Sequence, residues 1–149
     1  MNAIQRCIVS LIAKIKYRKK CIVEKDAVVL GKCVFEGKNK LSPGVYVKSV
    51  VMGYGSYIGK NSSISHAEIG RFCSIGDEVR LIRAKHPVDR FVSTHPAFYS
   101  TSSITCMVSH DKFEEYEQDK DGLSLIVGSD VWIGANVMIK AGKIGRAHV

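Results

Sequence analysis

An apolar residue recurs every six positions through the middle of this 149-residue chain, and this repeat constrains the fold more than any other feature. A six-residue period is too long for a turn of helix, and it is not the alternation of an ordinary strand. It predicts a β-solenoid in which three such segments, about eighteen residues, close one triangular coil. The apolar positions are Met52, Ile58 and Ile64, then, after a slip of one residue, Ile69, Ile75 and Leu81, and the pattern returns at Val127, Ile133 and Ile139.

The residues around the apolar positions support the same fold. Most apolar residues are followed by Gly, which we expect to relieve the backbone at the turn between two short strands. A smaller residue lies three positions further on, and His66 lies inside one segment, where we expect a coil corner. The glycines are Gly53, Gly59, Gly70, Gly76, Gly128 and Gly134, and the smaller residues are Ser56, Ser62, Cys73, Val79, Val131 and Val137.

The repeat stops from Arg83 to Ser124 and resumes afterwards. More than forty residues without the period must loop out of the solenoid. Loops of this length in compact proteins are usually functional or disordered. The first half of this loop combines His with aromatic residues, which favours function, and the acidic second half is compatible with a short surface helix.

The N-terminal segment, residues 1–20, predicts a basic amphipathic helix. Its apolar residues recur at helical spacing, and bases occupy the other positions. Two interpretations stay open: a helix docked on its own domain or a neighbouring subunit, and a helix lying on an anionic membrane surface. The apolar positions are Ile4, Cys7, Ile8, Leu11, Ile12 and Ile15.

Charge and cysteine usage exclude several classes of protein. The net charge is +8, but six bases and no acid fall in the first twenty residues, so the remainder carries only +2. This argues against a nucleic-acid-binding surface spread over the fold. No stretch approaches the roughly 20 apolar residues of a membrane span. The five cysteines are an odd number without C-x-x-C spacing, which disfavours a zinc or disulfide framework and fits a cytoplasmic protein, with membrane association through the helix left open.

Three motifs beside the repeat resemble the hexapeptide-repeat acyltransferases. They are Lys-His-Pro-Val-Asp at 85–89, Val-Ser-Thr-His-Pro-Ala-Phe-Tyr at 92–99 and Asp-Val-Trp-Ile-Gly-Ala-Asn-Val at 130–137. Within these enzymes the chain is similar to the branch of chloramphenicol and streptogramin (xenobiotic) acetyltransferases and polysaccharide or lipopolysaccharide O-acetyltransferases. The resemblance covers about residues 21–142, interrupted by the loop insertion at 83–124.

The resemblance implies a fold, an assembly and a reaction. The fold would be a left-handed parallel β-helix, assembled as a homotrimer with acetyl-CoA in the clefts between subunits. The reaction would be acetyl-CoA-dependent O-acetyl transfer to a hydroxyl of a saccharide or an antibiotic. No metal and no nucleic acid would take part.

The site residues follow from the resemblance together with side-chain chemistry. Transfer to a hydroxyl needs a base, and an imidazole titrates near neutral pH, so His86, which matches the catalytic His of these enzymes, is the expected base. Asp89 is expected to orient the loop or the imidazole. The remaining expected positions are His95, Phe98 and Tyr99 for acceptor binding, and Trp132, Gly134 and Ala135 for the pantetheine arm of CoA.

Two other functions stay open. A zinc enzyme of the γ-carbonic-anhydrase type needs three converging imidazoles, which His66, His86 and His95 would have to supply. A non-catalytic solenoid scaffold, held to a membrane by its helix, is the second alternative.

The C-terminus departs from the resemblance. Related enzymes continue for further coils and a Gly-rich segment, so we expect the C-terminal coils to be missing here. Residues 143–149 end in Ile-Gly-Arg-Ala-His-Val, which equals one reading frame of a common sequencing adapter, so we expect a non-native tail.

Overall fold

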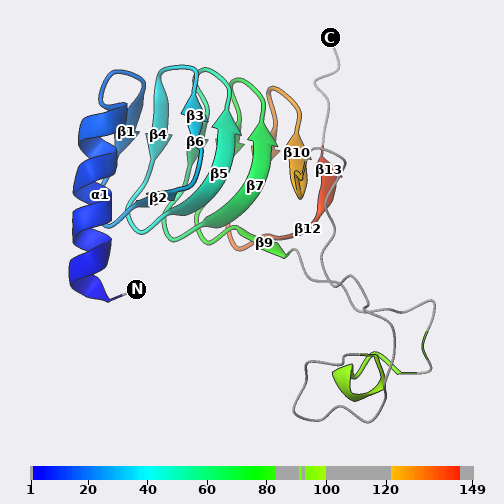
Figure 1. The fold of residues 1–149 in the computed structure, drawn as a ribbon. Helices are drawn as coiled ribbons and strands as arrows, with labels where there is room; N and C mark the ends of the chain where they lie inside the picture. Colours follow the sequence, from blue (N-terminus) through cyan, green and yellow to red (C-terminus); the bar gives the residue numbers. More distant parts are fainter. Residues whose placement is uncertain (1, 83–90, 92, 100–121, 145–149) are drawn as a thin grey trace. The chain divides into compact units, whose positions relative to one another are not determined.

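The structure is a computed structural model that describes residues 2–82, 91, 93–99 and 122–144. The chain divides into two compact units, residues 1–82 with 118–149, and residues 83–117. The first unit contains one helix, α1 (Ala3–Tyr17), followed by short parallel strands that wind into stacked coils (Figure 1). The predicted fold class, a mainly β solenoid with an N-terminal helix, is confirmed; the handedness taken from the resemblance stays a prediction.

Strand pairing defines three sides of the solenoid, and every pairing is parallel. The first side has the order β1 (Cys21–Val23), β4 (Asn39–Leu41), β6 (Tyr57–Ile58), β8 (Ser74–Ile75) and β11 (Trp132–Ile133). The second side contains β2 (Val28–Leu30), the first halves of β5 (Tyr46–Met52) and β7 (Ser63–Ile69), β9 (Arg80–Ile82) and β12 (Met138–Lys140). The third contains β3 (Val34–Phe35), the second halves of β5 and β7, β10 (Leu125–Val127) and β13 (Gly142–Ile144).

The register of the strands gives the length of a coil. Leu41 pairs with Ile58, and Ile58 pairs with Ile75, so each step is 17 residues. The next step, from Ile75 to Ile133, is 58 residues. The difference, 41 residues, is the insertion, which leaves the solenoid after β9 and returns before β10. There the Ser124 N–H donates to the His66 carbonyl at 2.7 Å.

The core is the column of inward-facing apolar residues that the repeat predicts. Met52, Ile58, Ile64 and Ile75 are fully buried, and so are most of their equivalents in the other coils. Leu81, beside the insertion, is only partly buried. The predicted smaller positions are also buried at Ser56, Ser62, Cys73 and Val79. Removing these stacked apolar side chains from water is the main force that holds the coils together.

The glycines of the repeat serve a different purpose from the expected one. A Cβ on Gly53 would lie 2.5 Å from the carbonyl carbon of Gly70, and a Cβ on Gly70 would lie 2.6 Å from that of Gly128. The left-handed backbone falls instead on residues two positions later, at Phe72 and Asp130, both with φ 58°. Close approach of successive coils, and not the turn conformation, therefore requires glycine here. His66, with φ 51°, lies at a corner as expected.

Helix α1 docks on the first coil through a face of small residues. Ser10 and Ala13 are buried, and the Tyr17 ring packs edge-on against Phe35 with centroids 4.9 Å apart. A capping box closes the helix start, because the Asn2 side chain accepts from the Gln5 N–H while the Gln5 side chain accepts from the Asn2 N–H. The predicted apolar stripe is exposed, so the contact with the solenoid uses the opposite face. Within the described residues, no helix is both long and apolar enough to span a membrane.

Candidate functional site

The expected catalytic residues, His86 and Asp89, lie outside the described residues, as does Cys106. Their roles stay predictions. The structure describes six of the eight expected site residues, three in the insertion and three on the solenoid.

Within the insertion, His95 caps a short 3₁₀ helix, η1 (Pro96–Phe98). Its Nδ1 accepts a hydrogen bond from the Ala97 N–H at 3.1 Å, and its own N–H donates to Ser93 Oγ at 3.1 Å. The sequence produces this turn locally, since Pro at the first helical position brings a fixed φ and no N–H that needs a partner. The imidazole itself is exposed.

The cap decides which ring nitrogen of the neutral His95 imidazole carries the proton. A ring nitrogen that accepts a hydrogen bond holds no proton, so the neutral imidazole is protonated on Nε2. In this form Nε2 is a donor and Nδ1 is occupied by the backbone. His95 is therefore suited to donate a hydrogen bond to an acceptor or an oxyanion, and it is poorly suited to remove a proton.

The two aromatic residues after His95 differ in their surroundings. Tyr99 is 3% exposed, and its ring lies 5.8 Å from that of Phe91 at an interplanar angle of 51°. Phe98 is 44% exposed. Tyr99 thus packs against Phe91 inside the insertion, whereas Phe98 offers an apolar surface that a ligand can cover.

On the solenoid, Trp132 points outward from the first side. It is 83% exposed, on strand β11, in register with Ser74 of β8 and Tyr57 of β6. Trp132 is therefore not part of the solenoid core. The small Ser74 beside it leaves the face of the indole accessible.

Gly134 and Ala135 follow Trp132 at the next corner. Nothing lies within 4 Å of the place where a Cβ on Gly134 would be, and Ala135 is exposed. The Gly134 carbonyl carbon and the Ala135 nitrogen both lie close to Gly76 of the preceding coil, 2.8 and 2.7 Å from its Cβ position. The backbone at 134–135 is thus supported by the preceding coil, and the open side of Gly134 is the side on which Gly53 and Gly70 meet the coil that follows them.

A groove of about 490 Å³ opens at the corner that leads into the first side. It was not among the expected sites. It is lined by Lys20, Glu36, Tyr54, Arg71 and Phe72, and the Tyr54 and Phe72 rings meet edge to face at 6.1 Å. The spacing of Glu36, Tyr54 and Arg71 is 18 and then 17 residues, one coil each, and this is the signal that could have found the column.

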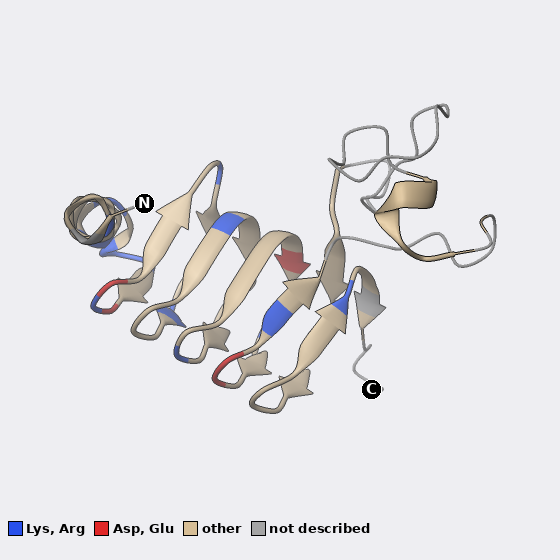
Figure 2. Ribbon diagram, turned by 90° about the horizontal axis from the view of Figure 1, so that it is seen from below, with Lys and Arg blue, Asp and Glu red and all other residues tan. Residues whose placement is uncertain are grey.

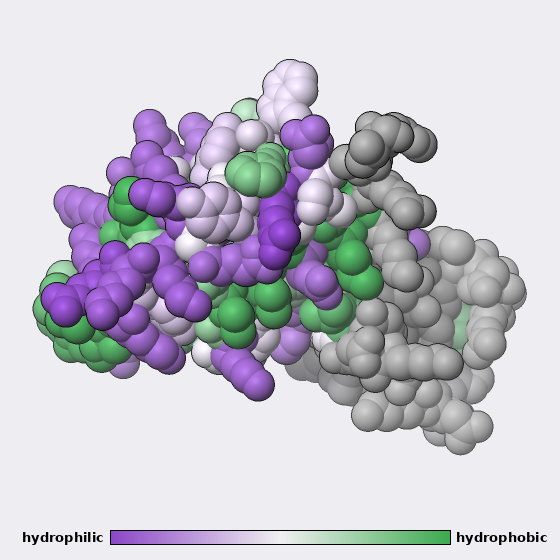
Figure 3. Space-filling model, turned by 90° about the horizontal axis from the view of Figure 1, so that it is seen from above, coloured by the Kyte–Doolittle hydropathy of each residue, from purple (hydrophilic) through white to green (hydrophobic). Residues whose placement is uncertain are grey.

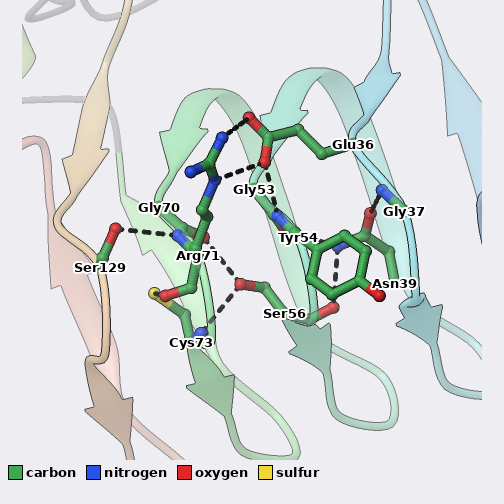
Figure 4. Close-up of polar contacts among 10 residues, drawn as sticks. All are labelled: Glu36, Gly37, Asn39, Gly53, Tyr54, Ser56, Gly70, Arg71, Cys73 and Ser129. Carbon is green, nitrogen blue, oxygen red and sulfur yellow. Dashed lines mark hydrogen bonds and ion pairs between the residues drawn. The ribbon is translucent and has the colours of Figure 1, made fainter.

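Figure 4 shows how this column is tied together. Arg71 Nε donates to Glu36 Oε2 at 2.7 Å, the Tyr54 N–H donates to the same oxygen at 3.0 Å, and the Arg71 N–H donates to Ser129 Oγ at 3.0 Å. The hydrogen bonds from Arg71, then the one from Tyr54, lower the pKa of the Glu36 carboxyl. A carboxylate held charged in this way is a poor acid or base at neutral pH, and Glu36 here links successive coils through Tyr54 and Arg71.

Buried polar groups beneath the groove are satisfied by the coil stacking. Ser56 Oγ donates to the Gly70 carbonyl at 2.7 Å and accepts from the Cys73 N–H at 2.8 Å (Figure 4). Cys73 Sγ repeats the first contact one coil later, donating to the Gly128 carbonyl at 2.9 Å. Cys73 is thus a packing residue at one of the predicted smaller positions of the repeat.

The other described thiols are no better suited to chemistry. Burial raises the pKa of Cys21 to about 12 and also raises the pKa of Cys33, so neither forms a thiolate at neutral pH. Cys7 is exposed on α1. Within the described residues, no group of three or more His, Cys, Asp or Glu is arranged to hold a metal ion.

The stacked coils, the six-residue repeat and the single long insertion define a hexapeptide-repeat β-solenoid. The chain is similar to a chloramphenicol acetyltransferase of Escherichia coli, 38% identical over 84 residues that cover 54% of this chain and 37% of that protein. It is also 36% identical, over the same shares, to a chloramphenicol acetyltransferase of Klebsiella aerogenes. The chain spans little more than a third of the length of these curated relatives. No family profile matches it, and no solved structure matches it significantly.

Proposed function

We propose that this chain is part of an acetyl-CoA-dependent O-acetyltransferase whose acceptor is the hydroxyl of an antibiotic of the chloramphenicol type. The observation that carries the proposal is the similarity to two chloramphenicol acetyltransferases, in a chain that folds as a β-solenoid with one long insertion. The resemblance of the motifs at 85–89, 92–99 and 130–137 supports the same reaction.

Acetyl-CoA fits the exposed solenoid residues as a co-substrate. The open face of Trp132 would pack along the pantetheine arm, and the backbone at Gly134 and Ala135, at the corner that follows, would exchange hydrogen bonds with its amides. The thioester supplies an activated acetyl group with a good leaving group.

In the proposed reaction, His86 removes the proton of the acceptor hydroxyl as its oxygen forms a bond to the thioester carbonyl. The carbon–sulfur bond then breaks, and the imidazolium of His86 returns the proton to the departing thiolate, so that an ester and free CoA result. Asp89 holds the His86 ring or its loop. His95 donates from Nε2 to the acceptor or to the oxyanion, in agreement with its Nδ1 cap.

The enzyme is proposed to act as a homotrimer, with each site between two subunits. Trp132 supports this, because an indole that is 83% exposed on a flat sheet has room for a second subunit and a ligand beside it. Light scattering would give a mass three times the 16.4 kDa of one chain.

A saccharide hydroxyl is the second candidate acceptor. The helix α1 is basic and exposes its apolar residues, which favours an acceptor close to a membrane. An antibiotic-modifying enzyme has no need of such a helix.

The test is release of CoA from acetyl-CoA in the presence of chloramphenicol, a streptogramin or a panel of oligosaccharides. It is run on this chain and on a chimera continued with the C-terminal part of the Escherichia coli relative. Release that depends on chloramphenicol and falls at least a hundredfold in His86→Ala supports the proposal. Release with oligosaccharides alone favours the second acceptor.

Absence of both acetyl-CoA binding and release in the chimera contradicts transferase activity and favours a scaffold. Stoichiometric zinc in the purified protein would favour the γ-carbonic-anhydrase type of enzyme instead.

A further inference from the structure

Helix α1 carries a continuous apolar surface that faces away from the solenoid. Its five residues, here called the outer face, are 54–72% exposed. Figure 3 shows apolar surface at the end of the molecule that α1 occupies, bordered by hydrophilic side chains. The outer face consists of Ile4, Ile8, Leu11, Ile12 and Ile15.

The orientation follows from the docking contact. Ser10 and Ala13 are buried against the first coil, where the Ser10 hydroxyl donates to the Glu24 carbonyl at 3.4 Å. At about 100° per residue, Ala13 lies roughly opposite the middle of the outer face. The solenoid therefore holds α1 with its apolar side outward, and Figure 2, which views the helix along its axis, shows it at the end of the coils.

The charge around the outer face is of one sign. Lys14 borders it on one side, and Arg18, Lys19 and Lys20 follow the end of the helix; all four are exposed. Lys16 borders the other side, with Nζ 5.0 Å from the centre of the Tyr17 ring. Residues 1–20 contain no acid. In the described part of the chain, the three ion pairs join Glu24 to Lys40, Glu36 to Arg71 and Glu78 to Arg80, so none of them neutralises this segment.

These charges distinguish between two occupants of the outer face. A second copy of α1 would bring Lys14 and the basic cluster against their own equivalents, and like charges at an interface oppose association. An anionic bilayer neutralises them while its acyl boundary receives the isoleucines, which is the arrangement of helices that lie in the membrane interface.

We propose that α1 is a membrane-surface anchor. Its outer face enters the interface of an anionic bilayer, its bases contact the lipid headgroups, and its Ser10–Ala13 face carries the solenoid. This property is separate from acetyl transfer and does not depend on it.

The experiment is flotation of the full chain with vesicles, without acetyl-CoA or acceptor. We expect the chain to float with phosphatidylglycerol–phosphatidylcholine vesicles and at least tenfold less with phosphatidylcholine alone. Binding should fall at 0.5 M salt, because the charge attraction is screened. The double variant Ile8→Gln/Ile15→Gln should bind at least tenfold more weakly.

The matched control is Met138→Gln on β12, which changes a side chain that is 70% exposed but lies on another element. It should bind as wild type does. Far-UV circular dichroism checks that all variants are folded. Absence of flotation with anionic vesicles, or equal binding by the Ile8/Ile15 variant, overturns the proposal. A drop in oligomeric mass of that variant without vesicles would assign the outer face to a protein interface instead.

Discussion

The Nδ1 atom of His95 accepts a hydrogen bond from the backbone N–H of Ala97 at 3.1 Å, and this contact separates the expected role of His95 from that of His86. A base must have a free nitrogen toward its proton donor. In His95 that nitrogen is committed to the cap, which leaves Nε2 as a donor and His86 as the expected base.

We therefore expect different kinetic effects from the two histidines. His95→Asn keeps a capping oxygen but loses the Nε2 donor, so the KM for the acceptor should rise about tenfold, the cost of one hydrogen bond. The pH profile of kcat should stay as in wild type, whereas His86→Ala should lose the acid limb, the fall in kcat that protonation of the base causes. A shifted profile in His95→Asn would make His95 the base.

Trp132 is the only Trp of the chain and is 83% exposed, so the Trp fluorescence of the protein reports directly on its proposed contact with CoA. Trp132→Ala should leave the free energy of unfolding within about 0.5 kcal/mol of wild type, as for most surface changes. It should also raise the KM for acetyl-CoA, with partial recovery in Trp132→Phe. In wild type, titration with CoA should shift the Trp emission to shorter wavelength; emission that stays constant at saturating CoA argues against contact.

Gly70 and Gly134 occupy the same position of the repeat but have different neighbours. A Cβ on Gly70 would lie 2.5 Å from the Ser129 nitrogen, whereas nothing lies within 4 Å of one on Gly134. Gly70→Ala should lower the free energy of unfolding by about 1–3 kcal/mol, as overpacking does. Gly134→Ala should change it little. Urea denaturation measures both, and equal effects would refute the steric explanation for glycine.

The Glu36–Arg71 pair should make stability depend on acid pH. Arg71 lowers the pKa of Glu36 below its ordinary 4.5 in the folded state, so the pair stabilises the fold above that value. This contribution is lost as pH falls through the lower, folded pKa. Glu36→Gln should lack this acid-dependent component, and Arg71→Gln should give the same profile.

Urea denaturation from pH 3 to 7 at low and high salt tests this pair. The two side chains are 41% and 63% exposed, so the contribution should be small and should shrink with salt. A wild-type acid profile in Glu36→Gln would mean that other groups carry the dependence.

Much of the fold could be predicted because the six-residue period reports burial directly. Ile58 and Ile75 are one coil apart and both fully buried, and the break in the period marks the insertion. The sequence predicted that glycine relieves the backbone at the turns, whereas the structure shows that it lets successive coils approach closely. Contact between coils depends on stacking distance, which local backbone preference does not reveal. The Glu36–Arg71 column was missed because its members are 35 residues apart and meet only through two coil repeats.

By itself, then, the sequence determined the solenoid, its inward residues and an amphipathic basic helix, since these follow from local periodicity. Only the tertiary structure decided which face of that helix is buried. Ser10 and Ala13 are small enough for α1 to approach the first coil closely, and the larger isoleucines are left outside. Periodicity identifies an apolar stripe, but the fit between two surfaces decides where the stripe points.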